Sequence, residues 1–305
     1  MRVLRFSVRT VTAYSLQGIF GLIVPYSKVR LMTNWNIPLE KESTFDLCIF
    51  CRENASSSRS VEHIIPESLG NIEHVLPAGI VCDRCNNYFA RKIEGPLLES
   101  AYFRHLRSQM SIANKRGRIP SMRGMLPHLG MGVDVWMDRD SIAVEPLDPG
   151  RRGDFERSLL AGQPGRLVLP VSNPDDVDRK LMSRFLLKAA MEALALRTME
   201  VEGWRKQLLD MEALDPLRRY VRVGDQPLKW NYLRRSLYPH DAFFSEDSEI
   251  YEVLHEFDFV YTEDKRLFFF IAIFGEEYGI DMSDPDSDAL GRCLSKMEGR
   301  SPLYT

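Results

Sequence analysis

The sequence predicts an α+β protein in which a small stapled module precedes a larger mixed α+β region. Three observations predict this fold class. Two CxxC pairs, Cys48 with Cys51 and Cys82 with Cys85, enclose a β-rich segment and lead into a short helical pattern. A capped helical pattern starts at Asn173, with Pro and two acids in its first turn. Near the C-terminal end, FDFVYT and LFFFIAIFG form the pattern of a β-hairpin around EDKR.

The composition is that of an ordinary globular protein and does not by itself indicate a binding partner. The chain has 305 residues with 44% apolar and 27% charged residues, which suits two modest globular domains. The net charge is only -3, but it is unevenly distributed. Residues 91–123 carry eight Lys or Arg and two Glu, a net charge of +6. Residues 241–290 carry fifteen Asp or Glu and two basic residues, a net charge of -13. The basic stretch would attract a polyanion and the acidic stretch would repel it.

Residues 1–31 hold five Lys or Arg, no acid, and the apolar run LQGIFGLIVPY, which is too short to span a bilayer as a helix. We interpret them as a disordered leader, or an upstream extension before a start at Met32, rather than a signal peptide. The cysteines favour this interpretation, because two CxxC pairs plus Cys293 indicate a metal site with one spare thiol. That usage suits a reducing cytoplasm, and we expect no membrane association.

Local patterns give the order of elements around the cysteines. SVEHIIP reads as a strand that stops at Pro66, and HVLPAGIVC as a hairpin that turns at residues 77–79. NNYFARKIE predicts a short helix that ends at residues 95–96, a Gly-Pro pair. The segment LLESAYFRHLRSQMSIANKR then continues as a basic helical stretch. The predicted first module therefore covers residues 40–125.

The remaining residues, 126–305, predict a mixed α+β region. GVDVWM and SIAVEPL flank the turn DRDS, and RLVLPV is expected to form a further strand. The helix that starts at Asn173 is expected to run to about Glu202, where Gly203 breaks it. Its predicted apolar stripe consists of Leu181, Phe185, Ala189 and Ala193. No internal repeat is evident.

The paired CxxC spacing predicts a structural zinc ion, because each tight turn supplies two thiolates to a tetrahedral site. The predicted ligands are Cys48, Cys51, Cys82 and Cys85. The alternative is four unrelated thiols in a loop-rich region. The segment between the pairs has few large apolar residues, so it needs such a staple. Four cysteines close the coordination sphere, and the Glu62-His63 pair between them therefore requires its own explanation.

Three motifs carry a family resemblance. CIFC, EHIIPESLGN and CDRCNN resemble the zinc-stapled branch of the HNH endonucleases, the ββα-metal nucleases, over roughly residues 45–95. The resemblance implies a zinc-stapled, treble-clef-like ββα-metal module. It also implies that His63 is the general base, and that Glu62 and Asn86 hold one catalytic Mg²⁺ or Mn²⁺. These roles are chemically sensible, because a neutral imidazole accepts a proton near neutral pH and hard cations take oxygen ligands.

The motif departs from the family pattern at two positions. Its third residue is Asn86 instead of the more usual His. The middle Asn, which should orient the base, usually lies shortly before the second CxxC, and HVLPAGIV has none. Asn71 is the nearest candidate for this catalytic role and Asn87 the next, and a backbone carbonyl is a further alternative. His74 is a candidate for phosphate contact.

Each assignment has a structural alternative. Glu62 and His63 would be a solvated strand end beside the zinc, Asn86 a helix cap, and Asn71 a turn residue after Gly70. The basic stretch is expected to contact nucleic-acid phosphates, and its alternative is a solvated face. The residues assigned to this contact are Arg91, Lys92, Lys115, Arg116 and Arg118.

We therefore expect a metal-dependent endonuclease that hydrolyses phosphodiester bonds in DNA. In this mechanism His63 activates water, and the divalent cation stabilises the transition state. The rival hypothesis is a non-catalytic, zinc-finger-like nucleic-acid-binding protein, which the missing middle Asn favours. A third and weaker hypothesis is an interaction protein whose acidic C-terminal region binds a protein partner.

Overall fold

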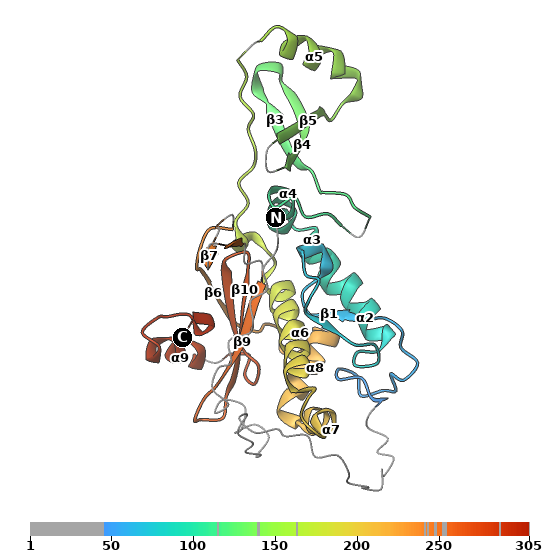
Figure 1. Cartoon of the computed structure of the whole chain (residues 1–305), viewed down its shortest axis with the longest axis vertical. Helices are drawn as coiled ribbons and strands as arrows, with labels where there is room; N and C mark the ends of the chain where they lie inside the picture. Colours follow the sequence, from blue (N-terminus) through green and yellow to red (C-terminus); the bar gives the residue numbers. More distant parts are fainter. Residues whose placement is uncertain are drawn as a thin grey trace. The chain divides into compact units, whose positions relative to one another are not determined.

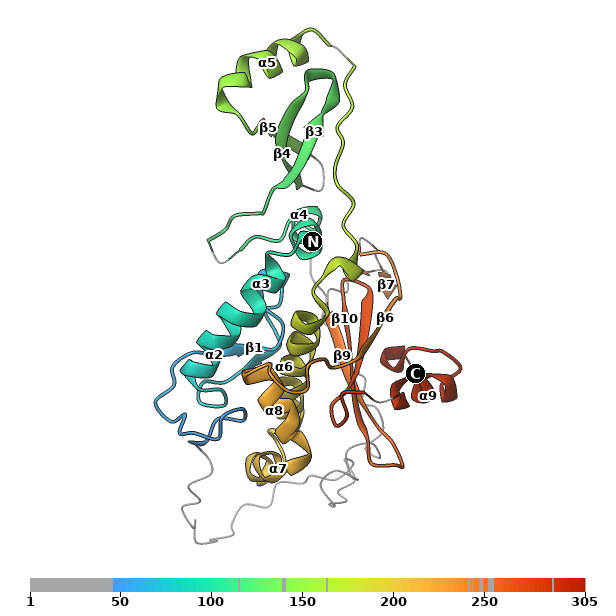
Figure 2. The same ribbon diagram turned by 180° about the vertical axis from the view of Figure 1, so that it is seen from behind.

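The computed structural model describes residues 46–114, 116–138, 141–162, 164–240, 242, 244–246, 249–251, 255–286 and 288–304. The predicted leader therefore lies outside the described residues. The chain divides into two compact units (Figures 1 and 2). Among these residues, unit 1 comprises those within 46–64, 73–90 and 183–304, and unit 2 comprises those within 65–72 and 91–182. Among the described residues, no helix combines the length and apolarity that crossing a membrane requires. Both units mix helices and strands, so the predicted α+β class is confirmed.

Unit 1 begins with the cysteine-containing segment. Strand β1 (Glu62–His63) pairs antiparallel with β2 (Val75–Leu76), and Glu62 lies opposite Leu76. Helix α2 (Asp83–Phe89) starts within the second CxxC pair and continues into a π-helical turn at Ala90–Glu94. Two strands followed by a helix is the order that the ββα resemblance implies.

Helix α6 (Arg179–Thr198) is the central helix of unit 1. In both views it runs between the β1–β2–α2 segment and the sheet that contains β9 and β10 (Figures 1 and 2). Residues 185–195 of α6 are all buried, including Lys188 and Glu192. A helix that is apolar almost all round is expected in such a position. Helices α7 (Trp204–Asp210) and α8 (Asp215–Arg222) follow it.

A four-stranded antiparallel sheet forms the rest of the unit 1 core. Its strand order is β6 (Tyr232–Ser236), β11 (Glu276–Asp281), β10 (Leu267–Ile273) and β9 (His255–Tyr261). The predicted hairpin is confirmed, because Leu267 pairs with Tyr261 across the turn. Every residue of β10 is buried, which explains its uninterrupted apolar sequence.

Smaller elements complete unit 1. Helix α9 (Ala289–Lys296) packs against β10 through Leu290, Leu294 and the spare thiol Cys293, beside Phe268 and Phe270. The short strands β7 (Phe244–Glu246) and β8 (Glu249–Tyr251) pair with each other. Short 3₁₀ turns lie at Glu212–Leu214 and Pro302–Tyr304.

Unit 2 contains a three-stranded antiparallel sheet, β3 (Met122–Leu126), β4 (Met131–Asp138) and β5 (Ser141–Pro146). The predicted pairing around DRDS is confirmed, because Asp138 lies opposite Ser141. Helices α3 (Gly95–Leu98), α4 (Ala101–Gln109) and α5 (Arg152–Leu160) complete it. Its 3₁₀ turns are Glu67–Leu69, Pro127–Leu129, Pro149–Arg151 and Pro174–Asp176.

Two predicted elements near the cysteines are wrong. HVLPAGIVC does not fold into a hairpin of its own. Its first half pairs with β1, and the carbonyl oxygen of Ile80 accepts a hydrogen bond from the N–H of Ile49, in the first CxxC turn, at 3.1 Å. The helix also does not end at residues 95–96. Pro96 lies in the first turn of α3, where a missing N–H is tolerated, and the π-helical turn absorbs the change of helical pitch before it.

Two further predictions need correction. RLVLPV forms no strand and contributes only an isolated bridge between Val168 and Met125. The cap at Asn173 does form, as a capping box with Asp176, but it starts a 3₁₀ turn. Val177 is then extended, so α6 begins only at Arg179, and it ends at Thr198 instead of Glu202.

Candidate functional site

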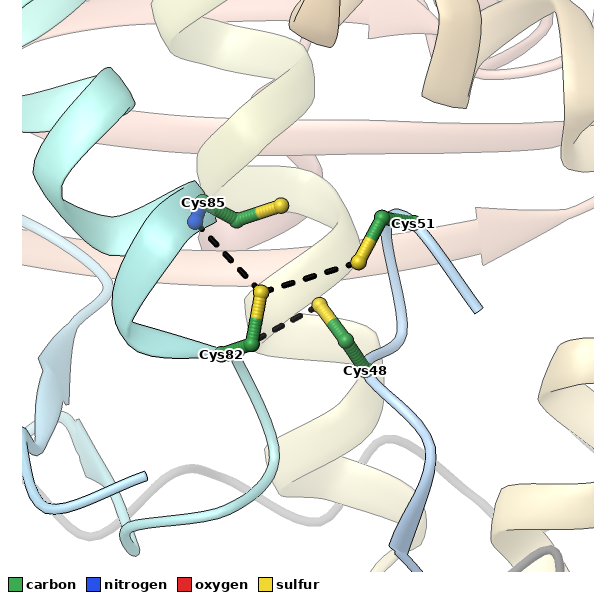
Figure 3. Close-up of side chains that lie close together, drawn as sticks. All are labelled: Cys48, Cys51, Cys82 and Cys85. Atoms are coloured by element: carbon green, nitrogen blue, oxygen red, sulfur yellow. Dashed lines mark hydrogen bonds between the residues drawn. The ribbon is translucent and has the colours of Figure 1, made fainter. Parts of the chain in front are cut away.

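Four cysteine side chains converge between two backbone turns of unit 1 (Figure 3). In the first turn, Arg52 adopts a left-handed φ of 57°, and its N–H bonds the carbonyl of Cys48 at 2.9 Å. In the second, Cys82 caps α2, and its sulfur accepts from the N–H of Cys85 at 3.4 Å. The N–H of Cys82 also points to the sulfur of Cys48, at 3.4 Å. These N–H···S contacts orient the sulfurs inward.

The cluster fits a tetrahedral metal ion. All four Sγ atoms lie within 4.8 Å of one another, and Cys51 and Cys82 are 3.6 Å apart. Zinc with Zn–S bonds of about 2.3 Å would place its sulfurs about 3.8 Å apart. The four cysteines are free thiols without a disulfide. The predicted four-cysteine cluster is therefore present, and it supports a structural zinc ion with a closed coordination sphere.

The thiols also need a cation to ionise together. A hydrogen bond from the Cys85 thiol, with help from backbone amides, lowers the pKa of Cys48 to about 5. Burial raises the pKa of Cys51 to about 11, and the neighbouring Cys48 raises that of Cys85 still further. Metal binding by all four sulfurs would therefore release protons.

Strand β1 directs Glu62 into the interior. Glu62 is only 3% exposed, and its Oε1 lies 2.6 Å from Nζ of Lys188 on α6. The same ammonium group contacts Glu192 Oε2 at 3.0 Å and donates to the carbonyl oxygen of His63 at 3.0 Å. His63, the next residue of the strand, is half-buried. A buried ion-pair network therefore fixes the backbone that carries the predicted base.

Helix α2 places Asn86 beside the same strand. Its Nδ2 donates to the carbonyl oxygen of Val61, the residue before Glu62, at 3.1 Å. Asn86 is not the helix cap, because Cys82 occupies that position. The carboxylate of Asp83 in the first turn accepts N–H groups from Arg59 and Ser60. The hydroxyl of Ser60, together with these amides, lowers the pKa of Asp83 below its usual value.

Comparison with protein families agrees with this arrangement of cysteines, strand and helix. Residues 48–101 match the family model of the HNH endonucleases. The match covers the cysteine cluster, β1, β2 and α2, and we refer to residues 48–101 as the HNH module. Searches of curated proteins and of solved structures found no match to the chain. The predicted resemblance is thus confirmed, and it supports a nuclease-like function and a nucleic-acid substrate at the level of the family.

Helices α7 and α8 hold the backbone beside the cysteine turns of the HNH module. Arg218 on α8 is only 4% exposed and donates from Nε to the carbonyl of Ile49 at 3.0 Å. Arg205 on α7 donates to the carbonyl oxygens of Leu47 (2.9 Å) and Gly79, so it bridges both turns. The roles of these two arginines were not predicted from the sequence. The only signal was the position of Arg218 within the helix pattern DPLRRYV, which does not name its partner.

The two asparagines considered for orienting His63, and His74 as the candidate for phosphate contact, have different environments. Asn71, in unit 2, is 3% exposed and donates from Nδ2 to the carbonyl of Ile65 at 2.7 Å. Its role toward the base stays a prediction. Asn87 is exposed on α2. The ring of His74 lies edge-on to that of Phe257, with 5.0 Å between the ring centroids, and burial lowers the pKa of His74, which favours the neutral imidazole.

Four of the five residues predicted to bind phosphates are described. Arg91 and Lys92 are exposed on the π-helical turn, and Arg116 and Arg118 are exposed in the loop after α4. The backbone N–H groups of both loop arginines bond Oδ1 of Asn114, at 2.9 and 3.1 Å, which shapes the loop. Lys115 lies outside the described residues. Exposure leaves these side chains accessible to a polyanion, and their contact with nucleic acid stays a prediction.

Proposed function

We propose that the HNH module is a metal-dependent endonuclease that hydrolyses phosphodiester bonds in DNA. The observation that carries the proposal is the bond from Asn86 to the carbonyl of Val61. It brings the helix residue of the motif next to the Glu62-His63 strand, in a frame stapled by the cysteines. That is the arrangement a metal-assisted hydrolase requires.

In this mechanism the imidazole of His63 takes a proton from a water molecule. The water oxygen then forms a bond to phosphorus while the bond from phosphorus to the leaving strand oxygen breaks, and that oxygen takes up a proton. Lys188 restrains the backbone at His63 through the His63 carbonyl, which keeps the base in position. A divalent cation, when bound, would stabilise the charge that develops on the phosphate.

The chain offers oxygen donors for such a cation. Asn86 uses its amide NH₂ toward Val61, so its Oδ1 is the atom that would serve as a ligand. Glu62 uses Oε1 toward Lys188, so Oε2 would be its contribution. One amide and one carboxylate oxygen suit a hard cation that keeps several water ligands, as Mg²⁺ does.

One observation favours the rival function. The carboxylate of Glu62 already pairs with a buried ammonium group, which competes with a second cation for its charge. A module in which Lys188 permanently neutralises Glu62 would bind nucleic acid without cutting it. Cleavage of plasmid DNA in Mg²⁺ by the full chain separates the two functions, because the binding protein leaves the plasmid intact.

His63→Ala and Asn86→Ala are expected to fail in different ways. Removing the base should lower cleavage by about 10² to 10⁴ while DNA binding survives. Asn86→Ala should raise the Mg²⁺ requirement, and excess Mg²⁺ or Mn²⁺ should restore part of the rate. The measurement is cleavage rate against divalent metal concentration, with zinc content checked for both variants.

Substitutions at two exposed residues of the same types provide matched controls. His128→Ala changes an exposed histidine of unit 2 and should cut normally. Asn87→Ala changes the exposed residue next to Asn86 and should keep normal metal dependence. Undiminished cleavage by His63→Ala would overturn the mechanism. If Asn87→Ala shifts the metal requirement and Asn86→Ala does not, the ligand is Asn87.

A further inference from the structure

Unit 2 contains a pocket of about 400 Å³ in which three arginines gather. Arg91 comes from the π-helical turn, and Arg104 and Arg107 lie three residues apart on α4, where side chains share a face. We call this the arginine pocket. Its lining consists of Ser68, Arg91, Gly95, Pro96, Leu98, Glu99, Arg104, Arg107, Asn114 and Pro120. Arg104 and Arg107 belong to the basic stretch but were not assigned a role from the sequence.

Arg107 is the unusual member of the pocket. It is 4% exposed, and its Nε is buried without a hydrogen-bond partner among the described residues. Burial lowers its pKa, and the adjacent charge of Arg104 acts in the same direction, while Glu99 opposes both. An arginine nevertheless stays cationic. A buried, incompletely paired guanidinium is costly to the fold, so its presence beside a pocket points to an anionic ligand.

The charge and the volume of the arginine pocket indicate which class of ligand it can bind. The lining holds three guanidinium groups and the carboxylate of Glu99, and this excess of positive groups suits a phosphate monoester better than a singly charged diester. The planar fork of arginine also fits phosphate oxygens in pairs. A volume of about 400 Å³ is in the range of small-molecule sites and exceeds the needs of a bare phosphate.

The remaining lining suits the rest of a nucleotide. Asn114 accepts backbone N–H groups through Oδ1, so the group it would offer a ligand is its NH₂ donor. Ser68 contributes a hydroxyl, and Glu99 an acceptor for a sugar hydroxyl or a base amine. Pro96, Leu98 and Pro120 supply apolar surface.

We propose that the arginine pocket binds a nucleotide through its phosphate monoester, as found at the phosphorylated end of a nucleic-acid strand. A terminal phosphate can approach a nearly buried arginine more readily than an internal diester, which is flanked by sugars on both sides. The choice of a strand end over a free nucleotide rests on the proposed nuclease function. The preference for a monoester does not.

The test is fluorescence anisotropy with the full, zinc-loaded chain in buffer without added Mg²⁺ or Mn²⁺, which prevents cleavage while the zinc stays bound. The probes are short single strands of one sequence that carry a 5′-phosphate, a 3′-phosphate or only hydroxyl ends. One phosphorylated end should bind about tenfold tighter or better than the hydroxyl form, given the worth of charge-assisted hydrogen bonds. Arg104→Gln and Arg107→Gln should abolish this difference.

The controls isolate the pocket from general charge. Arg123→Gln removes an exposed arginine of the same basic stretch that does not line the pocket, so it should weaken all probes equally and keep the end preference. If buried Arg107→Gln fails to fold, half-buried Arg104→Gln decides alone. Equal binding of all probes by the wild type, or loss of the preference in Arg123→Gln, would overturn the proposal.

Competition identifies the source of the monoester. A nucleoside monophosphate that displaces the phosphorylated strand at matched concentration assigns the site to free nucleotides, and one that competes poorly assigns it to strand ends. His63→Ala, which should cut far more slowly than the wild type, should retain the end preference. A wild-type chain that shows the preference but never cleaves would refute the nuclease function alone, and one that cleaves without the preference would refute the pocket alone.

Discussion

Lys188 illustrates how single residues decide the site. Its ammonium group is fully buried between Glu62 and Glu192 and also reaches the backbone of His63. Removing one partner of a buried ion pair leaves the other charge buried without compensation, so the network depends on every member. The residue thus links the stability of unit 1 to the position of the proposed base.

Lys188→Met should therefore destabilise the protein by about 3–5 kcal/mol, because two buried carboxylates lose their counter-ion. The deficit should shrink as the pH falls, since protonation neutralises the carboxyl groups. Urea unfolding at pH 5 and pH 7 measures both effects. The control is Lys229→Met, whose exposed side chain should change stability by less than about 0.5 kcal/mol. Equal losses in the two variants would refute the role of burial.

At the scale of elements, the cysteine turns and α2 form one stapled segment. Cys82 is both a predicted zinc ligand and the cap of α2, so metal loss should also loosen the start of the helix that carries Asn86. Strands β1 and β2 share only two residue pairs, which contribute little stability, so the fold of this segment depends on the cysteine cluster.

Elemental analysis of the purified chain should find about one zinc per molecule, and Cys82→Ser should remove most of it. Strong chelators should melt the HNH module, because metal-binding energy is folding energy here. Cys293→Ser is the matched control, since this thiol packs in the core beside α9 and should leave zinc unchanged. Full zinc content in Cys82→Ser would show that the cluster is not the metal site.

The sheet gives a second prediction at this scale. Gly279 on β11 lies opposite Phe270 of β10, and an added Cβ would come within 2.7 Å of that fully buried ring. Gly279→Ala should therefore cost about 1–3 kcal/mol through overpacking. Gly291→Ala, in open space on helix α9, should instead gain about 0.5–1 kcal/mol. Thermal unfolding of both variants tests the opposite signs.

Across the whole molecule, charge is segregated between the units. The basic stretch 91–123 belongs to unit 2, and the acidic stretch 241–290 belongs to unit 1. A polyanion is therefore expected to engage unit 2, where Arg116 and Arg118 are exposed. The predicted domains at residues 40–125 and 126–305 stay predictions.

Arg116→Ala combined with Arg118→Ala should weaken DNA binding and flatten its salt dependence. Two lost phosphate contacts would reduce the slope of log affinity against log salt by about 1.8. The control removes two exposed charges elsewhere, with Lys229→Ala and Arg300→Ala, and should leave the slope unchanged. An unchanged salt slope in the Arg116/Arg118 variant would show that the basic stretch is a solvated face without phosphate contacts.

The sequence by itself determined the features whose chemistry is local. CxxC spacing fixes which sulfurs face one another. The strand at Glu62–His63 and the helix that carries Asn86 were predictable because each depends on its own residue pattern. The β9–β10 hairpin was predictable for the same reason, since its turn and its apolar strands are adjacent in the chain.

Only the tertiary structure decided which distant groups meet. Lys188 pairs with a carboxylate 126 positions before it in the chain, Arg218 donates to Ile49, and Arg107 lies buried beside a pocket. No local pattern encodes these contacts, because a charged side chain is stabilised in the interior only by whatever partner the folded chain brings to it. The apolar faces that select those neighbours act through burial, which has no direction and no fixed spacing in the sequence.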